Sequence, residues 1–212
     1  MGVDLDGAGH RQPQADRRGA RPDATGVTAV LTAQTGSVTD STPAHSSSAW
    51  PRSDAAGLKF RAAGEADKPF LSRLYASTRV EELAVTDWSE AQKAAFLAMQ
   101  FQAQHAHYHT HYPEADWLVV EQAGQDIGRL YIERWPSQHR VIDIAFLPIH
   151  RRKGYGTALL RDLIDEARLA GKYVSIHVEK NNPARGLYVR LGFAVVEDKG
   201  VYDLMACSPA DP

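Results

Sequence analysis

The sequence predicts a mixed α/β (α+β) fold, in which a twisted, mostly antiparallel sheet of about seven strands carries helices on both faces. Two observations predict it. Segments with strand patterns alternate with segments of helical spacing, in the order strand, two helices, three strands, helix, strand, helix and two strands. The strand–helix–strand segment from Val141 to Glu179 requires a parallel, right-handed crossover, whereas the three strands before its helix can pair antiparallel.

The first part of the chain has the composition of a disordered segment. Residues 1–57 are rich in Gly, Ser, Thr, Pro, Ala and Asp, contain no Lys, and have Trp50 as their single aromatic residue. Such a segment buries too little apolar surface to offset its ordering entropy. We therefore expect residues 1–57 to be a disordered N-terminal extension, with a regulatory tail as the alternative, and residues 58–212 to form the folded domain.

The first half of the domain combines one strand with two helices. The segment "LKFRAA", residues 58–63, alternates between apolar and polar side chains and predicts the first strand. Residues 64–83 place apolar side chains at helical spacing. A second helix is expected over residues 89–112, because Ser89 is a suitable N-cap and Pro113 cannot continue a helix.

The second half changes to period two. Residues 116–135 predict two strands joined by a tight turn at Ala123, Gly124 and Gln125, and residues 140–148 predict a third strand that ends at its proline. The remaining expected elements are a helix that stops at Gly171, a strand over 172–180, a short helix over 183–191, and a terminal hairpin of residues 193–198 and 201–207.

One stretch, "RRKGYGTALL" (residues 151–160), places a run of cations and a pair of glycines where a helix begins. A helix N-terminus offers unpaired N–H groups and a positive dipole end, so this turn suits an anion; a solvated basic turn is the alternative. A P-loop would need its lysine after the glycines, but Lys153 precedes them. A dinucleotide fingerprint would need a third glycine where the chain has Leu159.

The glycine turn and a segment one strand later each match a motif of a known family. The glycine turn reads Arg151-x-x-Gly154-x-Gly156 and resembles the acetyl-CoA loop of the GNAT superfamily of N-acetyltransferases, Gln/Arg-x-x-Gly-x-Gly/Ala. The segment "NNPARGLYVRLGF", residues 181–193, is similar to the second acyl-CoA motif of that family, Asn-x-x-Ala-x-x-Leu-Tyr-x-x-x-Gly-Phe. Since both motifs occur at the family's separation, the chain is identified as a member of this superfamily over about residues 58–207.

The resemblance implies a GNAT fold and an enzyme, an acyltransferase that moves an acetyl group from acetyl-CoA to a primary amine by direct attack in a ternary complex. It implies that the pantetheine arm pairs with the end of the 140–148 strand and that the pyrophosphate lies on the N–H groups of the glycine turn. The coenzyme-binding residues that the resemblance implies are Ile144, Ala145, Phe146, Arg151, Arg152, Lys153, Gly154, Tyr155, Gly156, Thr157 and Asn181.

Two catalytic residues are expected. The resemblance implies that Tyr188 is the general acid that protonates the departing thiolate; a packed aromatic side chain is the alternative. Asp143 lies among apolar residues of a central strand, where a carboxylate needs a partner, and it is the candidate for the general base. Glu133, His150 and Glu179 are weaker candidates, and waters take the amine proton in some enzymes of this family.

The stretch "HAHYHTH", residues 105–111, raises the question of a metal site. Its histidines recur at helical spacing, but no acidic ligand lies in register with them, so no metal is expected. Because the first two helices select the acceptor in the GNAT family, Gln100, Gln104, Tyr108 and Tyr112 are expected to line the acceptor site. A purely structural helix and a homodimer face are the alternatives.

Composition limits the partners. The formal charge of −2 argues against nucleic acid, and the apolar runs are too short to span a membrane. Cys207 is the single cysteine and no signal peptide is recognised, so we expect a cytoplasmic protein. The acceptor is expected to be a small-molecule amine or a protein amine. A non-catalytic acyl-CoA-binding sensor is the alternative function.

Overall fold

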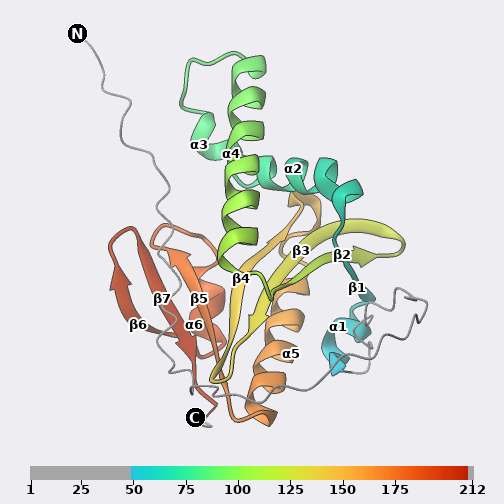
Figure 1. The fold of residues 1–212 in the computed structure, drawn as a ribbon, viewed down its shortest axis with the longest axis vertical. Coiled ribbons are helices and arrows are strands. Elements are labelled where there is room, and N and C mark those ends of the chain that lie inside the picture. The colour runs from blue at the N-terminus through green and yellow to red at the C-terminus, as the bar shows by residue number, and fades with distance from the viewer. Residues whose placement is uncertain (1–48, 210–212) are drawn as a thin grey trace, which may run out of the picture. The chain divides into compact units, whose positions relative to one another are not determined.

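The computed structural model describes residues 49–209, which form one sheet and the helices that pack on it (Figure 1). The strands are β1 (Leu58–Ala62), β2 (Asp116–Gln122), β3 (Gln125–Arg134), β4 (Gln138–Phe146), β5 (Tyr173–Glu179), β6 (Ala194–Lys199) and β7 (Tyr202–Cys207). The helices are α1 (Pro51–Ala55), α2 (Lys68–Ser77), α3 (Val80–Leu83), α4 (Glu90–His111), α5 (Tyr155–Leu169) and α6 (Arg185–Arg190), with 3-10 turns at Glu65–Asp67 and Pro148–His150.

The sheet confirms the predicted fold class. Its seven strands are ordered β1-β2-β3-β4-β5-β7-β6; β4 and β5 are parallel, and the other neighbouring pairs are antiparallel. α5 connects the two parallel strands, as the order of the elements requires. In the turn between β2 and β3, Ala123 and Gly124 have φ of 51° and 74°, the left-handed conformation that a two-residue hairpin turn favours.

The two faces of the sheet pack against different helices. His139 and Arg140 are consecutive and both buried, so their side chains point to opposite faces. His139 lies 3.8 Å from the carboxylate of Glu166 on α5. Arg140 lies beside Tyr112, which follows α4. The apolar core on the α5 face includes Leu130, Ile132, Val141, Leu159, Leu163, Val174 and Ile176.

α4 begins where the sequence predicts. The side chain of Ser89 accepts a hydrogen bond from the N–H of Gln92 at 3.3 Å, and the side chain of Gln92 accepts one from the N–H of Ser89 at 2.8 Å, which makes a capping box. The first half of α4 stands away from the sheet, and its C-terminal half reaches the sheet near β4 (Figure 1). Phe101 and Tyr108 are its buried residues. Within residues 49–209, no helix combines the length and apolar character needed to cross a membrane.

Residues 49–57 differ from the expectation of disorder, because they pack on the domain. Trp50 is only 3% exposed, and its indole N–H donates to Glu166 on α5 at 2.7 Å. The carboxylate of Asp162, also on α5, accepts a hydrogen bond from the N–H of Ser53 at the start of α1 (2.7 Å). Composition does not reveal that one large buried side chain and one capping carboxylate offset the ordering entropy of this stretch. The rest of the predicted extension, residues 1–48, lies outside the described residues.

We expect Trp50→Ala to lower the free energy of unfolding by about 3–5 kcal/mol, because the indole fills part of the core and satisfies Glu166. For a domain of this size the melting temperature falls by roughly 6–20 °C, measured by thermal unfolding. Leu169→Ala is the control, since Leu169 is 91% exposed. A melting temperature unchanged in both variants would show that the segment around Trp50 does not stabilise the domain.

Candidate active site

β4 and β5 separate at their carboxyl ends, beside the strand end with which the family resemblance pairs the pantetheine arm. We call the gap between these two backbone edges the crevice. Their backbone pairing ends at Val141 and Ile176. Beyond that point, residues 143–146 of β4 pair with β3, and residues 177–179 of β5 pair with β7. In the described part of the chain, the facing edges of these two segments have no strand partner. An extended ligand can therefore pair with the edge of β4 as an added strand.

A β-bulge determines which side chains of β4 lie on the face of the sheet that α4 covers. The register of β4 on β3 shifts between Val141 and Asp143, so that Ile142 is an extra residue. Because of the extra residue, Arg140 and Asp143 point to the same face of the sheet although they are three positions apart. That face lies under α4, whose Tyr108 donates its hydroxyl proton to Asp143 at 3.2 Å.

The glycine turn leads from the end of β4 into α5. Arg152 and Gly154 have φ of 57° and 86°, a backbone conformation that turns the chain sharply before the helix. Gly154 is the N-cap, and the N–H of Ala158 donates to its carbonyl at 2.9 Å. The N–H groups of the first turn, residues 155–157, therefore have no acceptor within the helix. They form, with the helix dipole, a site that favours an anion.

The side chain of Arg151 donates hydrogen bonds within the protein, whereas the motif implies that it contacts a phosphate. Its Nε donates to the carbonyl of Phe146 at 2.8 Å, and its Nη2 donates to the carbonyl and the hydroxyl of Ser77 at 3.1 and 3.2 Å. The guanidinium thus ties the glycine turn to the ends of β4 and α2. Arg152 and Lys153 are exposed in the turn, where their charges lie close to the helix N-terminus.

We expect Gly154→Val to weaken acetyl-CoA binding at least about 10-fold, because a β-branched side chain strains the positive φ and covers the N–H groups of the turn. Gly124→Val is a matched control. Both glycines have positive φ, and in both places an added Cβ meets nothing within 4 Å, so the backbone strain is comparable. Calorimetric titration of the two folded variants measures the effect. Equal acetyl-CoA affinities would remove the glycine turn from the coenzyme site.

Tyr188 lies on α6 and is 5% exposed, with its ring edge-to-face against Phe193 at 5.7 Å. Burial raises the pKa of Tyr188 above its usual value, and the negative charge of Asp143 raises it further. The phenol therefore keeps its proton at neutral pH and can act as a donor. Asn181 is exposed in the turn after β5, close to the N-terminus of the same short helix.

Asp143 has the partner that its position in an apolar strand requires. Arg129 on β3, whose side chain is 3% exposed, donates to both carboxylate oxygens, at 3.1 Å from Nε and 2.8 Å from Nη2. Burial opposes the charge of Arg129, but Asp143 outweighs it and keeps the pKa of the guanidinium above its usual value. Arg129 also donates to Gln104 of α4 at 3.1 Å. Sequence reasoning missed Arg129, although an arginine inside the strand "IGRLYI" is the signal that could have found it.

The weaker candidates for the base lie in different surroundings. Glu133 is buried and accepts from the indole N–H of Trp135. Glu179 ends β5 at the crevice and forms an ion pair with Arg79 at 3.6 Å. His150 lies in the 3-10 turn that precedes the glycine turn. Of these three, Glu179 is the one on an unpaired edge of the crevice.

The histidines of α4 pair with one another along the helix. The rings of His105 and His109 are 4.3 Å apart, those of His107 and His111 are 4.0 Å apart, and His109 also stacks on Trp117. Burial lowers the pKa of His105, His107 and His109. Among residues 49–209, no group of three or more His, Cys, Asp and Glu side chains is arranged to hold a metal ion.

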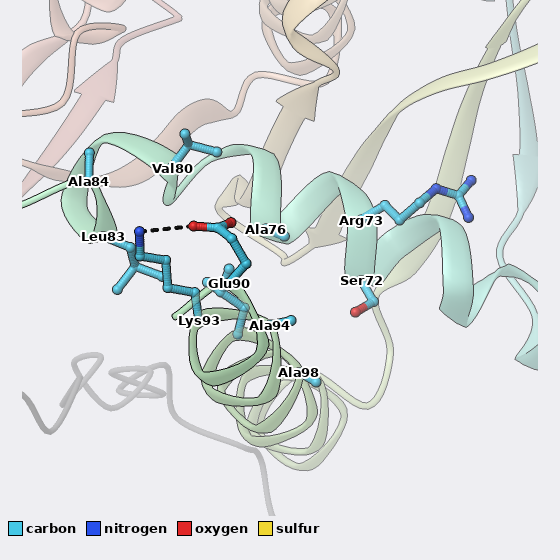
Figure 2. A pocket seen from close by; sticks show the side chains of 11 residues that line it. Ser72, Arg73, Ala76, Val80, Leu83, Ala84, Glu90, Lys93, Ala94 and Ala98 are labelled. Atoms are coloured by element: carbon cyan, nitrogen blue, oxygen red, sulfur yellow. Dashed lines mark hydrogen bonds and ion pairs between the residues drawn. The ribbon is translucent and has the colours of Figure 1, made fainter. Parts of the chain in front are cut away.

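A separate groove lies between α2, α3 and the first half of α4 (Figure 2). Its volume is about 430 Å³, and an ion pair between Glu90 and Lys93 lies at its edge. It is lined by Ser72, Arg73, Ala76, Val80, Leu83, Ala84, Glu90, Lys93, Ala94, Leu97 and Ala98. None of the sequence-predicted catalytic or coenzyme-binding residues lines this groove.

Comparison with protein families agrees with the two motifs. The model of the acetyltransferase (GNAT) family matches residues 78–193, which include the separated strands, the glycine turn and Tyr188. The chain belongs to the GNAT acetyltransferase family. This GNAT protein is therefore an acyltransferase, and its open, mostly antiparallel seven-stranded sheet is the GNAT fold. None of the curated proteins matches it significantly.

Solved structures share the fold of this GNAT protein at low sequence identity. PaiA N-acetyltransferase from Thermoplasma acidophilum, solved in complex with coenzyme A, is 15% identical, with a TM-score of 0.55 over 71% of this chain and 98% of that chain. An acetyltransferase from Thermus thermophilus is 18% identical, with a TM-score of 0.52 over 71% and 96%. A protein from Pyrococcus horikoshii is 17% identical, with a TM-score of 0.51 over 71% and 98%.

Proposed function

We propose that this GNAT protein transfers the acetyl group of acetyl-CoA to a primary amine by direct attack in a ternary complex. The observation that carries the proposal is the open edge of β4 directly before the glycine turn of α5. The open edge can take the extended pantetheine arm, and the turn can take its pyrophosphate. The coenzyme A complex of the Thermoplasma relative supports this choice of donor.

The backbone of β4 meets the electrostatic demand of the reaction. As the amine attacks the thioester carbonyl, negative charge develops on the carbonyl oxygen, and fixed N–H donors stabilise it best. The segment Ile144, Ala145 and Phe146 has one edge paired with β3 and the other edge open. We assign the oxyanion contact to an N–H of this open edge, because the strand is already held in place on its other side.

Two proton movements complete the transfer. The amine nitrogen bonds to the carbonyl carbon and loses a proton, the carbon–sulfur bond breaks, and the thiolate must gain a proton. We assign the proton that the thiolate gains to the phenol of Tyr188, which burial keeps protonated. Asp143 is engaged by Arg129 and Tyr108. We therefore assign the amine proton to a water beside Asp143, so that the carboxylate positions the proton acceptor.

The acceptor is a small-molecule amine or a protein amine, and it binds beside the crevice on the face of the sheet that α4 covers. Gln104 and Tyr108 support this placement, because they reach from α4 to the Arg129–Asp143 pair. An amine close to Asp143 on that face would lie next to the segment of β4 whose open edge is proposed to hold acetyl-CoA. A cytoplasmic setting fits Cys207, a single buried thiol.

A panel of primary amines, incubated with acetyl-CoA and the full chain, tests the proposal by release of free CoA thiol and by mass of the acetylated amine. We expect at least one amine to give both signals. If acetyl-CoA binds but no amine causes release of free CoA thiol, the sensor function would be supported instead. Thiol release without an acetylated amine would mean that water is the acceptor, and would contradict the proposal.

A further inference from the structure

Arg140 is a buried cation beside the crevice. It lies on β4 and is 5% exposed, on the α4 face that also carries Asp143. Its partner in the parallel register is Ser175 on β5, so the next β5 side chain on the same face is that of His177. His177 is also the first β5 residue beyond the last paired position. Arg140 and His177 therefore lie where the two strands begin to separate.

The described residues do not neutralise the charge of Arg140. Its Nη1 donates to the hydroxyl of Ser175 at 3.2 Å, and its Nη2 contacts Nδ1 of His177. Burial lowers the pKa of Arg140, and the neighbouring phenol of Tyr112 opposes this shift. Glu133 pairs with Arg140 across β3 and β4, but its carboxylate accepts from Trp135 and forms no ion pair with Arg140 in residues 49–209. An unpaired buried cation is costly.

The contact between Arg140 and His177 leaves two buried donors. Burial lowers the pKa of His177 to about 3, so its ring is neutral at physiological pH. Because a guanidinium can only donate, we assign the accepting role in this contact to Nδ1 of His177 and the ring proton to Nε2. Nε2 of His177 and Nε of Arg140 are both buried without a hydrogen-bond partner in the described residues. Both are donors, and a group with acceptor oxygens and negative charge satisfies such donors best.

We propose that Arg140 and His177 bind an anionic group of the acceptor, so that the enzyme acetylates primary amines that also carry a carboxylate or phosphonate-like group. This inference rests on the proposed function. With its amine near Asp143 and its anion near Arg140, such an acceptor lies along the α4 face of β4, because the bulge at Ile142 brings these two side chains to one face. A neutral amine of the same length leaves the buried cation without a counter-charge.

The test compares amines matched in length whose second group is a carboxylate, a phosphonate or a neutral amide. With saturating acetyl-CoA, we expect kcat/KM for the better anionic amine to exceed that for the amide by about 10–100-fold, mainly through KM. In Arg140→Gln the preference should fall to within a few-fold, and in Arg140→Lys part of it should return. Arg161→Gln, an exposed position on α5, is the control and should keep the preference.

His177→Leu serves as a second variant in case Arg140→Gln does not fold, because it removes one of the two donors and keeps the guanidinium. We expect it to raise KM for the anionic amine and to leave acetyl-CoA affinity unchanged. Equal kcat/KM for the anionic and neutral amines in the wild type, or a preference that survives in Arg140→Gln and His177→Leu, would overturn the subsite. If no amine of any kind is acetylated, the proposed function fails first, and the subsite fails with it.

Discussion

Tyr188→Phe is expected to lower kcat by about 10²–10⁴-fold, the range that general acid–base catalysis contributes. The ring remains, so its contact with Phe193 and the packing of α6 should persist. The phenolic proton is lost, and the leaving thiolate then has to take its proton from water. Acetyl-CoA affinity should change little, because the loss falls in the transition state. Steady-state kinetics and calorimetric titration measure the two quantities.

Tyr75→Phe is the matched control for this experiment. Tyr75 is also buried, but it lies on α2, with its ring 6.1 Å from that of Phe101 on α4. We expect kcat within a few-fold of wild type in that variant. A near-normal kcat in Tyr188→Phe, with an unaltered pH profile, would remove Tyr188 from the mechanism without affecting the assignment to the GNAT family.

Asp143→Ala is expected to lower the free energy of unfolding by about 3–5 kcal/mol, because it leaves the guanidinium of Arg129 buried without its counter-charge. Denaturant unfolding measures the loss. Asp87→Ala, at an exposed carboxylate, should leave stability within about 0.5 kcal/mol of wild type.

The double variant Arg129→Met and Asp143→Ala separates charge burial from lost packing. If the unpaired guanidinium is the cause, the double variant should be more stable than Asp143→Ala alone, because no buried charge remains. A double variant that is less stable than either single variant would show that lost packing, and not the unpaired guanidinium, causes the loss. In all these variants, activity is compared only after folding has been confirmed by circular dichroism.

The sequence alone determined the order of the seven strands, the positions of α4, α5 and α6, and the family; α1 was not predicted, and the one helix expected over residues 64–83 is divided into α2 and α3. Periodicity marks strands and helices because each repeats on its own residue spacing, and the caps at Ser89 and Gly154 depend on neighbouring residues only. The motifs from Arg151 to Gly156 and from Asn181 to Phe193 are local as well, since each is one turn with the helix that follows it. Caps, turns and short motifs depend on residues that are neighbours in the chain, and so they can be predicted without a structure.

The tertiary structure alone decided which side chains meet. The extra residue Ile142 is invisible in the alternation of β4, yet it places Arg140 and Asp143 on one face. The partners of these residues come from other elements: Arg129 from β3 and His177 from β5. Such pairings depend on strand register and on which helix covers a face, and both are set by packing between segments far apart in the chain. For the same physical reason, composition assigned the segment around Trp50 to disorder, whereas its contacts with α5 hold it in the folded domain.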